Sequence, residues 1–255
     1  MGLWDKVKGE LIDIIEWIDE SSDTLVFRFE RYGNEIKNGA KLVVRESQVA
    51  VFINEGELAD VFPPGTYTLE TQNLPILSTL KGWKHGFKSP YKAEVYFVST
   101  RLNKNNKWGT PNAFYIRDQD FGRVSLRAFG TYTFKVGDAA KFIKNVSGTE
   151  GEFTTDEVSG ELRSLIVTRF IDAVGESKLS LLDFASNYKD LSDFCQKKLQ
   201  EEFVDYGLKV QKFLISSINL PEELQKKLDM GTGLNMVGDM DKYQQMKMAD
   251  AMEAA

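Results

Sequence analysis

The N-terminal end of the chain has an amphipathic pattern with the period of an α-helix. Residues 2–18 read GLWDKVKGELIDIIEWI, with apolar side chains at helical spacing and charged residues opposite them. The apolar stripe consists of Leu3, Trp4, Val7, Leu11, Ile14, Ile15, Trp17 and Ile18. It is shorter and more charged than the roughly 20 mainly apolar residues that cross a bilayer. The pattern predicts a helix that lies on a membrane, docks on a partner or folds back onto its own domain.

The part of the chain that follows is rich in β-strand patterns. Alternating or β-branched runs indicate strands over residues 24–32, 41–45, 48–53, 57–62, 66–69, 93–100 and 123–136. The strand over 93–100 is apolar on both faces, which is typical of a central strand. Gly130 interrupts the longest run, and we expect a bulge or bend there.

Helical spacing replaces the strand pattern near Gly137. We expect a short helix capped by Asp138, helices over 156–174 and 187–206, and Gly207 as the stop of the last one. Residues 208–220 form a strand pattern, Pro221 starts another helix, and 239–255 are Met- and Ala-rich and helical.

This order of elements is typical of the α+β class rather than of alternating βαβ units. The predicted parts are an amphipathic helix over 1–20, a β-rich subdomain over 21–136, an α+β subdomain over 137–230, and a glycine hinge with a helical tail over 231–255.

Composition narrows the classes of function. The 255 residues are 42% hydrophobic and 27% charged, as in ordinary globular proteins. A net charge of −6 argues against a general nucleic-acid binder. Cys195 is the only cysteine, and charged residues interrupt the N-terminus, so neither a disulfide nor a signal peptide is predicted. A reducing cytoplasm is the expected compartment.

One segment is rich in cations, although the chain as a whole has a negative net charge. Between Lys81 and Lys107 the chain carries further cations and many aromatic residues against a single carboxylate, Glu94. Lys81, Lys84 and Lys88 could form a surface for phosphate or lipid headgroups. The alternative is a solvated loop beside a strand whose aromatic residues face the core, which is the usual meaning of a charge run.

Groups for catalysis are scarce. His85 is the sole histidine, Cys195 lies on an apolar helical stripe, and no cluster has the spacing of zinc ligands. Asp118 and Asp120 could bind a cation or act as an acid–base pair, but a turn aspartate that accepts local N–H groups is the simpler interpretation. We therefore predict no enzymatic activity and no cofactor or metal.

Several segments resemble a known family. Residues 38–52 (NGAKLVVRESQVAVF) and 62–69 (FPPGTYTL) are similar to the opening of the SPFH (stomatin, prohibitin, flotillin, HflK/C) or Band 7 domain. Residues 107–112 (KWGTPN) and 127–132 (RAFGTY) resemble its soluble bacterial YdjI-type branch, labelled "virion core protein-like". Residues 218–223 (INLPEE) match the strand-to-helix corner of SPFH domains, and the resemblance covers about residues 35–230.

The resemblance implies an α+β SPFH domain, homo-oligomerisation, scaffolding at a membrane and no catalytic residues. Stomatin-like members have an N-terminal hydrophobic segment, whereas this chain has only the amphipathic stripe, so the expected attachment is peripheral, on the cytoplasmic face of the cell membrane. The branch is associated with envelope-stress systems, which implies phage-shock-protein-A-like remodelling proteins as partners. Its members commonly continue into a zinc ribbon, and the uncapped tail leads us to expect a continuation here.

Two functions stay open at this point. The first is a non-enzymatic scaffold whose N-terminal helix inserts into a membrane surface. The second is a soluble adaptor whose helix docks on a partner protein. Through Ile18 the helix has two lysines against four acids, whereas helices that lie on membranes carry a basic polar face. This acidic face favours the adaptor.

Overall fold

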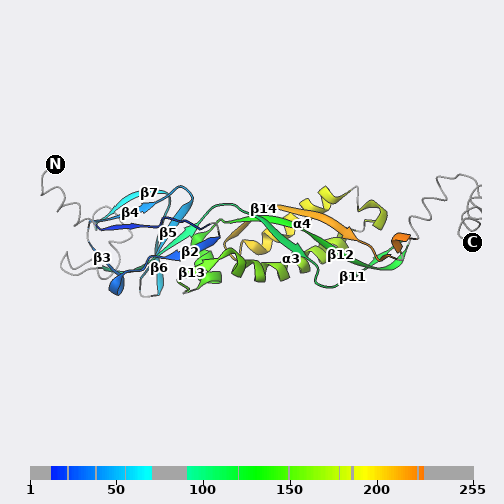
Figure 1. Ribbon diagram of the computed structural model, residues 1–255, viewed down its shortest axis with the longest axis horizontal. Helices are drawn as coiled ribbons and strands as arrows, with labels where there is room; N and C mark the ends of the chain where they lie inside the picture. Colours follow the sequence, from blue (N-terminus) through cyan, green and yellow to red (C-terminus); the bar gives the residue numbers. More distant parts are fainter. Residues whose placement is uncertain are drawn as a thin grey trace, which may run out of the picture.

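Residues 13–226 form an elongated body with a β-rich half at one end and a half of sheet and helices at the other (Figure 1). The computed structural model describes these residues apart from 22, 38, 55, 71–90, 120, 149, 178, 185–186 and 223. Among the helices in these ranges, none combines the length and apolarity that a bilayer crossing needs. The α+β class is confirmed.

The β-rich half consists of two packed sheets and a short ladder. The larger, antiparallel sheet has the order β13 (Glu152–Thr154), β2 (Thr24–Arg28), β9 (Glu94–Ser99), β5 (Gln48–Asn54) and β6 (Glu57–Phe62). The smaller sheet has the order β1 (Ile14–Glu16), β4 (Ala40–Val44) and β7 (Gly65–Leu69). A two-stranded ladder joins β3 (Glu35–Ile36) to β8 (Tyr91–Lys92).

Strand β9 lies between two hydrophobic cores. Val95 and Phe97 pack in the core shared with the smaller sheet, while Tyr96 and Val98 belong to the core shared with the helices. All four side chains are buried, because β9 is paired on both edges and covered on both faces. The prediction of a central strand is confirmed.

The second half is built around the long strand β12 (Gly122–Val136). One edge of β12 pairs with β11 (Phe114–Asp118) and then β10 (Asn103–Gly109), and the other edge pairs with β14 (Leu208–Asn219). Helices α3 (Thr155–Ser177) and α4 (Tyr188–Phe203) cover one face of this sheet (Figure 1). Shorter helical turns are α2 (Ala139–Phe142), the π-helical turn Ile143–Ser147, and the 3-10 turns Tyr32–Asn34 and Leu181–Asp183.

The boundary between the halves differs from the predicted one at 136/137. Strands β10, β11 and β12 share a sheet with β14, so residues 103–136 belong with the helical half. The reason is the pairing of β12: its buried alternate side chains pack in the same core as the helices, and both of its edges pair with strands of the second half. Conversely, β13 returns from the second half to pair with β2.

The predicted helix over residues 2–18 is wrong for its last turn, because Ile14–Glu16 forms strand β1. β1 pairs in parallel with β4, and the backbone of Asp13 extends this ladder by accepting from the N–H of Lys41 at 2.7 Å. The Trp17 ring stacks on Phe27 with 5.5 Å between ring centres. Pairing and burial at this edge override the local helical pattern.

The helix ends behave as predicted. Asp138 caps α2 by accepting from the backbone N–H of Lys141 at 3.0 Å. Gly207 ends the turn after α4 with φ +71°, where an added Cβ would lie 2.4 Å from the Asp138 carbonyl oxygen. Its own carbonyl accepts from the N–H groups of Gly137 and Asp138 at 2.9 and 3.0 Å. Gly207 therefore ties the end of α4 to the start of α2.

Candidate interaction surface

The structure separates the residues of the predicted apolar stripe. Ile15 is fully buried and Trp17 is 6% exposed, so these two side chains belong to the core of the domain and are unavailable to a membrane or partner. Ile14 and Ile18 are 51% and 61% exposed. Leu3, Trp4, Val7 and Leu11 lie outside the described residues. The predicted binding of the stripe to a membrane or partner is therefore limited to Ile14, Ile18 and the stripe residues that precede β1.

The acidic residues at the end of this segment are paired within the domain. Asp13 accepts from Arg31, and Glu16 accepts from Arg45 at 3.0 Å. These two carboxylates account for the acidic excess of residues 2–18, because residues 2–12 contain two lysines and two acids. The charge of residues 2–12 is thus balanced.

The proposed headgroup lysines Lys81, Lys84 and Lys88 lie outside the described residues, as does His85. The structure describes the neighbouring aromatic residues Tyr96, Phe97 and Trp108, and all three are buried. This agrees with the interpretation in which aromatic residues of the segment face the core.

Asp118 holds together two parts of the second half. Its Oδ1 accepts from the N–H of Phe121 at 3.0 Å, and its Oδ2 accepts from the N–H of Leu181 at 2.7 Å. Asp118 is 4% exposed, and its carboxylate joins the β11–β12 turn to the connection between α3 and α4. The turn-aspartate interpretation is confirmed for Asp118, while Asp120 lies outside the described residues.

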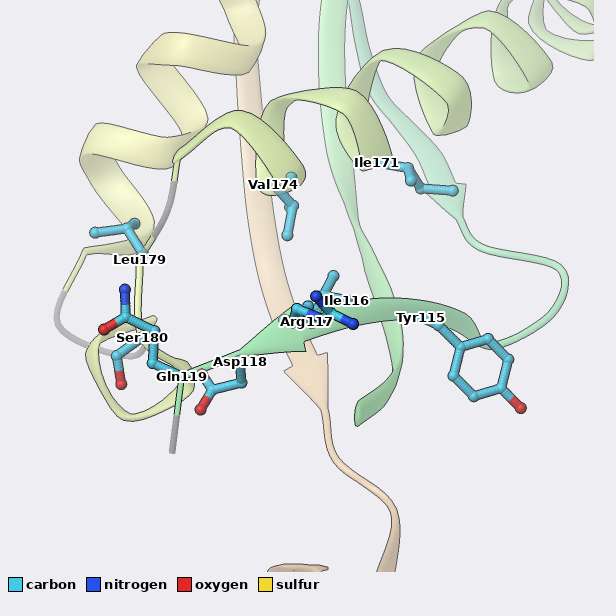
Figure 2. Close-up of a pocket in the computed structure, with 10 residues that line it drawn as sticks. Tyr115, Ile116, Arg117, Asp118, Gln119, Ile171, Val174, Leu179 and Ser180 are labelled. Carbon is cyan, nitrogen blue, oxygen red and sulfur yellow. The ribbon is translucent and has the colours of Figure 1, made fainter. Parts of the chain in front are cut away.

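An open pocket lies beside Asp118, between β11 and the C-terminal end of α3 (Figure 2). Ile116 points up from the strand and Val174 points down from the helix, whereas Tyr115 points away from both. The walls are apolar on the helix side, and Arg117 lies at the strand side. No group of acidic, histidine or cysteine residues that could hold a metal occurs in the described part of the chain.

Cys195 is a structural thiol. It is fully buried on the inner face of α4, and burial raises the pKa of its thiol to about 12. A thiol with so high a pKa is protonated at neutral pH and is a poor nucleophile. The sequence-based interpretation of a buried structural cysteine is confirmed.

The face of the second sheet that is turned away from α3 and α4 carries cations on all four strands. We call it the basic sheet face. Odd-numbered residues of β12 and their cross-strand neighbours form it, since the even-numbered ones pack under the helices. Its cations are exposed or half-buried: Lys107, Arg117, Arg123, Arg127, Lys135, Lys209 and Lys212.

The basic sheet face contains no carboxylate among the described residues. Asp118 is the only acidic residue of β10, β11, β12 and β14, and it is buried. Three large apolar side chains are exposed among the cations: Tyr115 (61%), Phe129 (48%) and Leu214 (40%). The result is an acid-free surface on a chain whose net charge is −6.

Sequence reasoning missed this face because its cations are spread over residues 107–212. The available signal was the outer row of the strand over 123–136, where Arg123, Arg127 and Lys135 alternate with apolar residues. Neighbouring strands add cations only through long-range pairing, which the sequence does not display.

The comparison with protein families is decisive for the fold. The family model described as SPFH domain-Band 7 family matches residues 26–236, from β2 to beyond β14. The chain belongs to the SPFH domain-Band 7 family. It is also 32% identical over 247 residues to the uncharacterized protein YdjI of Bacillus subtilis (strain 168), covering 96% of this chain and 76% of that protein. The resemblance to the SPFH domain and to its YdjI-type branch is confirmed.

Proposed function

We propose that this SPFH-domain protein is a non-enzymatic scaffold that binds peripherally to the cytoplasmic face of the cell membrane and assembles there with copies of itself. The observation that carries the proposal is the family match over residues 26–236, because SPFH proteins are often membrane-associated scaffolds. In this role the assembly recruits membrane-remodelling partners of the phage-shock-protein-A type.

The N-terminal segment supports membrane attachment. Residues 2–12 keep four residues of the apolar stripe, Leu3, Trp4, Val7 and Leu11. The acids that argued against a membrane, Asp13 and Glu16, are paired with arginines of the folded domain. The acidic excess was the main reason to expect that this segment binds a protein groove rather than a bilayer, and residues 2–12 do not have it.

Strand edges support assembly. Among the strands that the structure describes, β6 and β13 lie at the edges of the five-stranded sheet, and β1 and β7 at the edges of the three-stranded sheet. Edge strands present unpaired N–H and C=O groups that can pair with another copy of the chain. Leu58 and Val61 on β6 are 52% and 38% exposed, so this edge also offers apolar contact.

Vesicle co-sedimentation with light scattering tests both parts. We expect the full chain to sediment with vesicles that contain anionic lipid, and its mass in solution to exceed that of one copy. Deletion of residues 2–12, which leaves Asp13 and β1 in place, should weaken sedimentation without changing the thermal midpoint. A chain that stays in the supernatant with every vesicle would overturn the proposal, and a chain that is monomeric with and without vesicles would overturn its assembly part.

The soluble adaptor remains the competing function, favoured by the exposed Ile14 and Ile18 beside the N-terminal segment. It predicts no sedimentation with vesicles and a stable complex with a protein partner that is lost on deletion of residues 2–12. The same two preparations therefore decide between the scaffold and the adaptor.

A further inference from the structure

We infer that the basic sheet face is the surface through which the folded domain contacts the anionic headgroups of a lipid bilayer. The inference rests on the proposed function and adds which face of the domain meets lipid. It concerns β10, β11, β12 and β14, in the half of the molecule that does not contain β1.

Two pairs of like charges on this face point to an external anion. In the strand register, Arg117 lies directly opposite Arg123, and Lys135 lies directly opposite Lys209. Like charges in directly opposed positions destabilise a sheet. The ion pairs of the described residues involve none of these four side chains. Phosphate groups brought from outside would offset both repulsions.

The arginine pair is arranged to receive phosphate. The Arg123 guanidinium lies over the Tyr115 ring at 4.1 Å from its centre. This contact restrains the Arg123 guanidinium on the outer face, opposite Arg117 in the strand register, and arginine donors bind phosphate oxygens with two parallel hydrogen bonds. A phosphodiester headgroup between Arg117 and Arg123 would satisfy donors of both residues.

Apolar side chains lie between the two cationic pairs. Phe129 is flanked across the strands by Gly109, which has no side chain, and by the small Ser217, so its ring stays exposed. Leu214 lies on the neighbouring strand opposite Thr131. Exposed apolar side chains bordered by arginine and lysine match the boundary between headgroups and acyl chains.

The extent of the face favours lipid over a rigid acidic partner. Arg123 and Lys135 are twelve residues apart on one strand, which corresponds to about 40 Å. Strands twist along such a length, so a protein partner would need a matching twisted shape. Mobile headgroups can follow the twist without prior complementarity.

The opposite side of the domain strengthens this orientation. Helices α3 and α4 contain nine carboxylates against five cations. A domain with a basic sheet face and an acidic helical layer is oriented by an anionic surface, with the helices turned away from it.

The test uses the full chain with one residue of each like-charge pair changed to glutamate, as the double variant Arg117→Glu with Lys209→Glu. Each substitution turns a repelling pair into an attracting one, so the thermal midpoint should equal or exceed that of the wild type. We expect binding to vesicles of phosphatidylcholine with phosphatidylglycerol to fall by at least about 30-fold, since each of the two lost cations contributes about 1 kcal/mol and the new carboxylates are repelled. Binding of the wild type should also fall when salt rises from about 0.1 M to about 1 M.

A matched control places the same charge change on the helical layer. Lys189→Glu with Lys197→Glu alters two exposed lysines of α4. Its binding to the anionic vesicles should stay close to that of the wild type. A loss as large as that of the Arg117/Lys209 variant would mean that net charge alone decides, and would overturn the inference.

The remaining outcomes are equally clear. If the wild type binds vesicles and the Arg117/Lys209 variant binds equally well, the inference fails while the proposed function stands. If the wild type does not bind, both fail.

Self-association that is lost in the variant while vesicle binding persists would assign the face to a second copy. Tighter binding to a short DNA duplex than to vesicles would assign it to nucleic acid, and either result overturns the inference.

Discussion

The indole N–H of Trp108 donates a hydrogen bond of 3.2 Å to the backbone carbonyl of Leu214, across the strand that contains Gly130. Trp108 is opposite Gly130 on one edge of β12, and a bulge in β14 adjoins Gly130 on the other edge. The Trp108 ring also contacts Phe170 of α3 and Phe213 of β14, with ring centres 4.7 and 4.9 Å away. The absence of a side chain at Gly130 lets three strands and a helix meet at this ring.

Gly130→Ala should destabilise the second half strongly. An added Cβ would lie 1.9 Å from the Leu214 carbonyl oxygen and 2.8 Å from the Trp108 Nε1. Because backbone must move to make room, we expect a loss of roughly 3 kcal/mol in the free energy of unfolding. Urea unfolding followed by tryptophan fluorescence measures it. Gly160→Ala is the control: this exposed position within α3 has no atom within 4 Å of the added Cβ, so a gain of up to about 1 kcal/mol is expected.

Elements with strong local signals could be predicted from the sequence. The alternation of β12, the cap at Asp138 and the stop at Gly207 each depend on residues close in the chain. The bulge expected within residues 123–136 lies instead in β14, opposite Gly130. Strands β10 and β11 were missed. β10 reads NKNNKWG, which shows no apolar alternation, and it is held as a strand by its pairing with β12 and by the burial of Trp108.

The misassigned end of the first helix has the same physical cause. Ile14, Ile15, Trp17 and Ile18 fit a helical stripe, yet a strand also places Ile15 and Trp17 on one face and Ile14 and Ile18 on the other. Pairing with β4, which comes later in the chain, stabilises the strand rather than the helix at residues 14–16. The basic sheet face depends in the same way on strand register, so neither its charge pairs nor its extent could be read in advance.

Substitutions at Ile14 and Ile15 distinguish the strand from a helix. Ile15 is fully buried in the core shared with the smaller sheet, so Ile15→Ala should cost about 2–4 kcal/mol in the free energy of unfolding. Ile14 points outward and is 51% exposed, so Ile14→Ala should change stability by less than about 0.5 kcal/mol. Thermal unfolding of both variants provides the comparison. Equal, small effects at the two positions would contradict the strand.

Removal of the Asp118 carboxylate should loosen the end of the second half. Asp118→Ala leaves the N–H groups of Phe121 and Leu181 without their acceptors, and the latter bond is buried. We expect a loss of about 2–3 kcal/mol and faster amide exchange at Leu181. Asp118→Asn keeps one acceptor oxygen and should lose less. Loss of stability that is identical for both variants would show that the negative charge matters more than the acceptor geometry.

The buried thiol of Cys195 predicts a decline of stability in alkali. The pKa of the thiol is raised to about 12 in the folded state by burial, whereas an exposed thiol ionises near pH 9. Below pH 9 both states are protonated and the contribution is complete. Between pH 9 and 12 only the unfolded state releases its proton, so stability falls as the pH rises. Urea midpoints across this range should therefore decrease, and native Cys195 should not react with a thiol reagent at neutral pH.

Cys195→Ala isolates the thiol from other groups that titrate in the same range. Tyr96 also has a raised pKa of about 12, from burial and from its hydrogen bond to Glu94, and it lowers alkaline stability in the same direction. The variant should therefore keep part of the decline and lose the share due to the thiol. Its stability at neutral pH should be lower by about 1–2 kcal/mol, because a small cavity replaces the sulfur. An unchanged slope between pH 9 and 12 would mean that Cys195 ionises equally in both states, and that its burial is transient.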